Sequence, residues 1–191
     1  MRLLYIYTFF ILLLFSLTSC TTTNYYIVRH AEKLYQNGDT PLSEAGFCRA
    51  QRLAKELSDK EISVIFVSDQ QRTQQTAMNT AKLFEVTPTI IPEAQTDELI
   101  KQLEKVNGKN VLVVRHSPEI HLIVNALSPS DTIDEIDDEF DNLFVIRKRV
   151  FPGGETSIQL ERLKYGPEHY PVFLNCRILI PEPPFSMTPI Q

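Results

Sequence analysis

Two arginine–histidine pairs, each at the end of an apolar run, are the residues best suited to chemistry in this sequence. Arg29 and His30 end a run that begins at residue 25, and Arg115 and His116 end a run over 111–114. A guanidinium group binds phosphate oxygens and an imidazole can act as a nucleophile, so such a pair suits a phosphorylated molecule. One pair alone would be weak evidence, because an isolated histidine is more often structural than catalytic.

A third apolar run, over 62–67, ends in Ser68 and Asp69 and is soon followed by Arg72. Each of the three runs is short and rich in β-branched residues, which predicts a buried strand. In a parallel sheet the carboxyl ends of the strands share one edge, and ligands bind at that edge. We therefore expect the three strand ends to bring two histidines and several arginines together.

Four segments, in this order along the chain, resemble the motifs of the histidine phosphatase superfamily, specifically its phosphoglycerate mutase-like branch. They are Val-Arg-His-Ala-Glu-Lys at 28–33, Asp-Thr-Pro-Leu-Ser-Glu-Ala-Gly at 39–46, the run 67–77, and Val-Arg-His-Ser at 114–117. Ala31 stands where glycine is commoner, as in some small bacterial phosphohistidine phosphatases. The match runs from about residue 25 to 166, and four ordered motifs are a specific signal.

The resemblance implies a role for each matched residue. His30 would be the nucleophile that forms a phosphohistidine intermediate, and His116 would contact the phosphoryl group. Arg29 and Arg72 would hold the non-bridging oxygens, whose charge persists through a loose transition state. Neither a metal nor a cofactor is required by this chemistry.

Two positions depart from the usual pattern of the family or match it loosely. Glu93 lies where the family often carries its general acid, but the sequence around it is only loosely similar; Asp97 and Glu98 are the alternatives, and both are typical of a helix start. An arginine directly before the second histidine is unusual, and Arg115 would contact either the substrate or a surface carboxylate. Both alternatives stay open at the level of sequence.

The elements that must position these residues alternate between strand and helix. After the first strand and the loop that follows it, Ser43 is a good N-cap for a helix, and apolar residues then recur at helical spacing. This βαβ pattern predicts a three-layer α/β/α sandwich with a mostly parallel sheet and a hairpin at its edge. The expected helices are 43–59, 68–84, 96–106 and 118–127, and the expected later strands are 87–91, 111–114, 142–150 and 155–163.

The amino terminus carries a targeting pattern. Residues 3–17 are apolar but too short for a confident membrane span, and Leu-Thr-Ser-Cys at 17–20 resembles a bacterial lipoprotein box. We expect a signal peptide over 1–19 and a lipid anchor at Cys20, which would place the protein in the bacterial cell envelope, facing the periplasm or the exterior. The alternative is an ordinary signal peptide with a chance cysteine.

The remaining chain is expected to divide into a tether, one domain and a tail. Their predicted bounds are 20–24, 25–166 and 167–191, the last being rich in proline. Cys48 and Cys176 are the only other cysteines. They could pair, although Cys48 on a helix is equally consistent with a small buried apolar residue.

Composition narrows the choice of partners. The formal net charge is −5 and there is no basic run, which argues against nucleic acid. The expected partners are a small phosphorylated substrate or a phosphoprotein, and a membrane through the lipid at Cys20. The competing function is a phosphate-binding or interaction module that kept the pocket and lost turnover, whose sequence sign would be a missing nucleophile; His30 is present.

Overall fold

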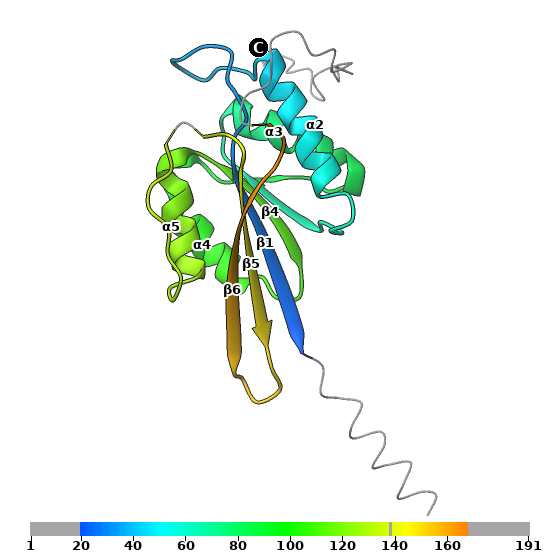
Figure 1. The fold of residues 1–191 in the computed structure, drawn as a ribbon, viewed down its shortest axis with the longest axis vertical. Coiled ribbons are helices and arrows are strands. Elements are labelled where there is room, and N and C mark those ends of the chain that lie inside the picture. The colour runs from blue at the N-terminus through cyan, green and yellow to red at the C-terminus, as the bar shows by residue number, and fades with distance from the viewer. Residues whose placement is uncertain (1–19, 138, 168–191) are drawn as a thin grey trace, which may run out of the picture.

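A six-stranded sheet forms the centre of the protein, as shown by the computed structural model, which describes residues 20–137 and 139–167 (Figure 1). The strand order is β3-β2-β4-β1-β5-β6. Neighbours from β3 to β1 pair in parallel, whereas β5 and β6 are antiparallel to their neighbours. This confirms the prediction of a mostly parallel sheet with a hairpin at one edge.

The helices and strands lie where the sequence predicts them, with shifts of a few residues at their ends. In chain order they are β1 Thr21–Arg29, α2 Glu44–Glu56, β2 Val64–Val67, α3 Gln71–Phe84, β3 Thr89–Ile90, the 3-10 turn η1 Glu93–Gln95, α4 Thr96–Lys105, β4 Asn110–Arg115, α5 Ser117–Leu127, β5 Asn142–Val150 and β6 Thr156–Lys164.

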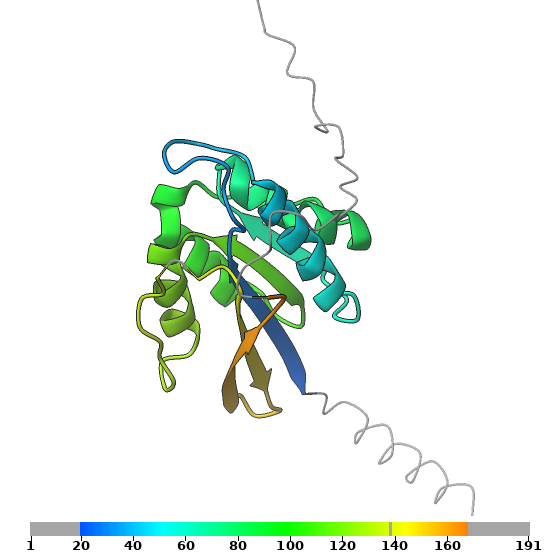
Figure 2. The ribbon, with the colours of Figure 1, turned by 45° about the horizontal axis from the view of Figure 1, so that its top comes forward.

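Alternate residues of β1 face opposite sides of the sheet, and each side has its own core. Tyr25 and Ile27 pack with apolar residues of α4 and α5, while Tyr26 and Val28 pack with those of α2 and α3. Figure 2 shows the two helix pairs on opposite sides of the sheet. Burying each large apolar side chain stabilises the fold by about 1.5–3 kcal/mol. A shift of the strand by one residue would turn these side chains to the opposite face and would greatly destabilise the fold. The three-layer architecture is therefore confirmed.

Helix α2 passes very close to the segment that follows β1. Ser43 caps the helix, and its Oγ accepts a hydrogen bond from the backbone N–H of Gly46 at 3.2 Å, as the sequence predicts. A Cβ atom added at Gly46 would lie 2.2 Å from the backbone oxygen of Glu32. Only glycine therefore allows α2 to lie this close to the residues after His30.

The predicted tether over 20–24 is wrong from Thr21 onward, because these residues belong to β1. Thr21 to Asn24 extend the antiparallel ladder with β5, where Thr21 is opposite Val150. Thr23 is buried, and its Oγ1 accepts a hydrogen bond from the N–H of Gly108 at 2.9 Å. Threonine is β-branched and suits a strand. The polar character of this segment suggested a loop, but the pairing with β5 decides its conformation.

Several predictions concern residues beyond those described. The signal peptide over 1–19 and nearly all of the proline-rich tail, including Cys176, lie outside the described residues. Cys20 is exposed with a free thiol, and Cys48 is buried and disulfide-bonded. Within 20–137 and 139–167, no helix is both long enough and apolar enough to span a bilayer.

Candidate active site

Two histidines from distant parts of the chain meet at the carboxyl edge of the sheet. His30 follows β1 and His116 follows β4, and these parallel neighbours end in register at Arg29 and Arg115. The centroids of the two imidazole rings lie 5.3 Å apart. Arg72, in the first turn of α3, has its NH2 atom 3.2 Å from Nδ1 of His116. His30, His116 and Arg72, which the sequence predicts to meet, therefore lie close together, in a group of side chains that we call the pocket.

The hydrogen bonds around His30 fix which ring nitrogen carries the proton. Its Nδ1 lies 2.7 Å from the carbonyl oxygen of Ala31. A carbonyl can only accept, so Nδ1 is the protonated nitrogen and Nε2 keeps its lone pair. The N–H of Ala31 in turn donates to Oγ1 of Thr76 in α3 at 2.9 Å. The ring is held so that Nε2 is the atom able to attack an electrophile.

His116 carries its proton on the other nitrogen. A guanidinium can only donate, so Nδ1 of His116 accepts from Arg72 and Nε2 is protonated. Ser68, directly after β2 and fully buried, has its Oγ 2.9 Å from this Nε2 and 2.9 Å from Oγ1 of Thr73. The imidazole is thus fixed between a guanidinium and a hydroxyl group.

Burial keeps both imidazoles neutral. Loss of hydration is the largest cause of the shifts, and it lowers the pKa of His30 to about 3 and that of His116 to about 2. The backbone of Ala31 raises the pKa of His30 in part, while the charges of Arg29 and Arg72 lower it further. Each of the two histidine residues is only 3% exposed. A neutral imidazole at pH 7 is the form that can act as a nucleophile.

Arg29 and Arg72 approach the pocket in different ways. The NH1 group of Arg29 donates to the carbonyl of Asp137 at 2.9 Å, and its guanidinium carbon lies 4.3 Å from the centroid of the Phe140 ring. That ring is 6.0 Å from His30. Arg29 therefore lies against the loop that follows α5, and its positive charge lowers the pKa of His30. Nε of Arg72 is buried and has no hydrogen-bond partner among the described residues, so it can still donate to an anion.

Glu93 brings a carboxylate to the same pocket. Its Oε2 lies 3.7 Å from Nε2 of His116 and 3.9 Å from NH2 of Arg72. The side chain is 44% exposed, so it faces solvent at the mouth of the site. The alternatives Asp97 and Glu98 lie in the first turn of α4, where the helix dipole favours acidic residues.

Arg115 takes a position that differs from both alternatives drawn from the sequence. It is fully buried, and its NH1 donates to the carbonyl of Ile91 at 2.6 Å. Its Nε and NH2 donate to Oε1 of Glu119, at 3.0 and 2.5 Å. Glu119 is only 6% exposed, so the partner is a buried carboxylate and not a surface one.

Two residues of the site were missed by sequence reasoning. Ser68 could have been found from the sequence, because it directly follows the apolar run over 62–67 and so reaches the same sheet edge as the histidines. Glu119 had a weaker one: an acidic residue in the first turn of α5 looks like a dipole-favoured surface residue, and only the fold shows that it is buried beside Arg115.

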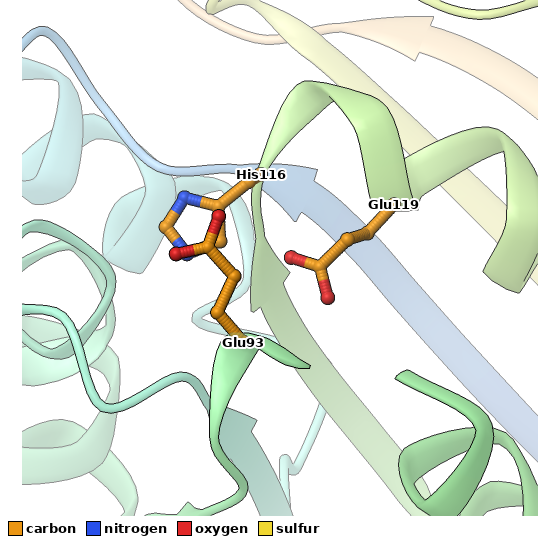
Figure 3. Close-up of side chains that lie close together, drawn as sticks. All are labelled: Glu93, His116 and Glu119. Atoms are coloured by element: carbon orange, nitrogen blue, oxygen red, sulfur yellow. The ribbon is translucent and has the colours of Figure 1, made fainter. Parts of the chain in front are cut away.

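One cluster near the pocket has the spacing of a metal site. Glu93, His116 and Glu119 each offer a ligand atom within 4.8 Å of the others, and Figure 3 shows the Glu119 carboxylate directed toward the other two side chains. However, Nε2 of His116 carries a proton, and the guanidinium groups of Arg72 and Arg115 donate to His116 and Glu119. A divalent cation would stand between two positive charges, so the charges of the cluster favour proton transfer over metal binding.

Comparison with known proteins places this geometry in context. Residues 25–96 match the sequence model of the histidine phosphatase superfamily (branch 1), and no curated protein matches the chain. The structure of the protein histidine phosphatase SixA complexed with tungstate shares 20% identity and a TM-score of 0.58, over 74% of this chain and 96% of that one. The structure of a protein assigned as SixA of Agrobacterium tumefaciens shares 21% identity and a TM-score of 0.55, over 75% of this chain and 99% of that one.

A third solved structure carries the same fold with a different activity. The mycobacterial glucosyl-3-phosphoglycerate phosphatase shares 14% identity and a TM-score of 0.55, over 74% of this chain and 98% of that one. At such identities the likeness shows the fold alone. Over residues 25–96, which hold three of its four motifs, the chain is similar to the histidine phosphatase superfamily (branch 1), and it shares its fold with these solved phosphatases.

Proposed function

We propose that the chain is a phosphatase that hydrolyses phosphomonoesters or phosphohistidine through a covalent phosphohistidine on His30. Family and fold support phosphatase activity in general. The observation that carries the finer proposal is the pair of neutral imidazoles 5.3 Å apart, one of them bonded to Arg72. This set offers a nucleophile and cationic donors for one phosphoryl group.

In the first step, Nε2 of His30 attacks phosphorus in line, and the bond from phosphorus to the leaving group breaks. The leaving group takes the bonding electron pair and a proton from the carboxyl group of Glu93. The imidazole becomes positively charged as its N–P bond forms. The carbonyl of Ala31, which already accepts from Nδ1, stabilises that charge.

The phosphoryl oxygens stay negatively charged throughout, so positioning and charge carry most of the catalysis. Arg72 would donate to them from its buried Nε and from the NH2 group that now contacts His116. Arg29 adds positive charge beside His30. His116 completes the anion pocket from the adjacent strand end.

In the second step a water molecule attacks phosphorus and the N–P bond breaks. The electron pair returns to Nε2 of His30, the proton of the water passes to the Glu93 carboxylate, and inorganic phosphate leaves. No metal takes part, so we propose that the enzyme is metal-independent. The solved relatives include a protein histidine phosphatase and a sugar-phosphoglycerate phosphatase, and both a phosphoprotein and a small phosphorylated molecule are therefore substrate candidates.

The test uses the chain from residue 21 onward and an aryl phosphate. We expect turnover that survives a chelator, and His30→Ala should lower it by roughly a thousandfold or more because the nucleophile is lost. His121→Ala, outside the pocket, is the matched control and should keep activity. Phosphate binding without turnover on a broad substrate panel would instead identify a binding module.

We also propose that Cys20 carries a lipid that holds the protein at a membrane of the cell envelope. The support is the sequence Leu-Thr-Ser-Cys over 17–20 and the exposed, free thiol of Cys20 directly before β1. Acyl chains gain about 0.8 kcal/mol for each buried CH₂ group, and two chains give stable anchoring.

A further inference from the structure

A buried ion pair lies beside the segment that carries the proposed general acid. We call residues 91–93 the acid loop, because it joins β3 to η1 and ends in Glu93. Arg115 and Glu119 are 0% and 6% exposed, and two nitrogens of the guanidinium donate to the same carboxylate oxygen. The pair stands directly behind the acid loop.

Arg115 binds the backbone of every residue of this loop. Its NH1 donates to the carbonyl of Ile91 at 2.6 Å, and its NH2 lies 3.2 Å from the carbonyls of both Pro92 and Glu93. Three consecutive carbonyl oxygens therefore converge on one guanidinium. Lysine could not reproduce this pattern, because its ammonium lacks the planar fork of donors.

Further contacts hold Glu93 from its other sides. Oγ1 of Thr96 lies 2.5 Å from Oε1 of Glu119 and 3.3 Å from the carbonyl of Glu93. The N–H of Glu93 donates to Oδ1 of Asp69 at 3.0 Å. The backbone of Glu93 is thus fixed at both its N–H and its C=O, while its carboxylate is left 3.7 Å from His116.

Stability alone is a weak reason for such a pair. Taking two charges out of water is costly, and apolar residues of similar size often serve as well or better. What an apolar pair cannot do is hold three carbonyl groups in one place. The arrangement is therefore suited to fixing the position of Glu93.

We infer that Arg115 and Glu119 are positioning residues that hold Glu93 for protonation of the leaving group, and that the substrate is an alkyl phosphomonoester. The inference rests on the proposed phosphatase function and narrows its substrate class. An alkoxide is a poor leaving group and needs its proton in the transition state. A phosphohistidine whose other ring nitrogen is protonated releases a neutral imidazole, and an aryl oxide is a weak base, so such substrates would gain little from a fixed acid.

The experiment compares kcat/KM for glycerol phosphate and for p-nitrophenyl phosphate on the same enzyme preparation. The ratio of the two values does not depend on how much of the protein is folded and active. Glu93→Gln should lower the alkyl-to-aryl ratio by roughly a hundredfold, the usual minimum for a lost general acid. Arg115→Lys and Glu119→Gln should each lower it by about tenfold, since the acid remains but is misplaced.

Arg49→Lys is the matched control. Arg49 is equally buried and pairs with Glu32 at 2.7 Å, but its guanidinium also donates to the carbonyls of Tyr165 and Pro167 in the chain after β6 and not to those of the acid loop. This variant should change both substrates alike and leave the ratio within about twofold. Glu119→Gln keeps the side-chain shape, so it decides the question where Arg115→Lys does not fold.

Three outcomes would overturn the inference. The first is an unchanged ratio in Arg115→Lys and Glu119→Gln while Glu93→Gln moves it. The second is an unchanged ratio in Glu93→Gln, which would leave a His30-dependent phosphatase without this acid. The third is a kcat/KM for a phosphohistidine peptide above that for every alkyl ester. By contrast, aryl phosphate turnover that persists in His30→Ala would refute the proposed function itself.

Discussion

His30 and His116 stay neutral at acidic pH values at which a solvated imidazole would be protonated. Three of the four ring nitrogens have a hydrogen-bond partner in Ala31, Arg72 or Ser68, and these partners define opposite tautomers in the two rings. Burial then removes the proton that a solvated imidazole would carry below its ordinary pKa of about 6.5. The same burial that keeps the two imidazoles neutral also makes the folded state sensitive to acid.

The first prediction is therefore a loss of stability as the pH falls. The folded-state pKa values of about 3 and about 2 lie below the unfolded value, so between roughly pH 6.5 and 3 the unfolded chain binds more protons than the folded chain. For each of the two histidines the free energy of unfolding should fall with a slope that approaches about 1.4 kcal/mol per pH unit below about pH 5.5.

Urea denaturation between pH 7 and 5 measures this slope. The double variant His30→Asn, His116→Asn should show a shallower slope, because asparagine does not titrate. His121→Asn, which lies outside the pocket, serves as the control and should keep the slope of the unchanged chain. Equal slopes in the double variant and the unchanged chain would refute this explanation.

At the scale of elements, the alternation along a strand decides where each arginine points. Arg29 and Arg115 are paired in register, and each follows a residue that faces α2 and α3, so both belong to the side covered by α4 and α5. The two histidines come one residue later, where the same alternation predicts the opposite side, and His116 indeed contacts Arg72 of α3. This rule was available from the sequence, and it predicts that Arg115 does not point with His116.

Other features could not be read from the sequence in the same way. The contact of Arg29 with Asp137 and Phe140 depends on the path of the loop between α5 and β5, which no residue pattern specifies. The strand character of Thr21 depends on pairing with β5, a partner more than a hundred residues away. Strand ends and helices follow local patterns, whereas these contacts require the assembled sheet.

The second prediction concerns the closeness of α2 to the segment after β1. Gly46→Ala would place a Cβ 2.2 Å from the backbone oxygen of Glu32, so α2 or the segment that follows β1 must move. We expect the free energy of unfolding to fall by roughly 1–3 kcal/mol. We also expect kcat to fall, because His30 is two residues from Glu32 and a small misplacement is costly in catalysis.

Gly38→Ala provides the comparison for this variant. Gly38 has φ +80° and nothing within 4 Å of an added Cβ, so it tests backbone strain without a clash. Gly38→Ala should lower the free energy of unfolding by about 1 kcal/mol. A thermal unfolding experiment and an aryl phosphate assay on both variants measure the two effects. Gly46→Ala with unchanged stability and activity would show that α2 can move away freely.

The molecule as a whole has its proposed anchor and its pocket at opposite ends of one strand. β1 begins at Thr21, next to Cys20, and its nine residues end at Arg29, directly before His30. A strand rises about 3.3 Å per residue, so the two ends are roughly 30 Å apart. Because β1 lies between β4 and β5 in the sheet, it cannot bend to bring them closer.

The third prediction follows for the full-length chain in bacterial cells. The protein should sediment with membranes, and Cys20→Ser should release it to the soluble fraction, because the acyl chains would be lost. Cys20 is exposed and outside the pocket, so the variant should keep its aryl phosphate activity. Membrane association that persists in the variant would refute the lipid anchor.

Because β1 starts at Thr21, the proposed lipid on Cys20 would be joined to the sheet without an intervening linker. With β1 directed away from the bilayer, a lipidated protein would hold the His30 edge of the sheet up to roughly 30 Å from Cys20, well outside a Debye length of about 8 Å from the headgroup charge. Phosphate groups of the membrane itself would then stay out of reach, and only molecules diffusing through the surrounding fluid would be dephosphorylated.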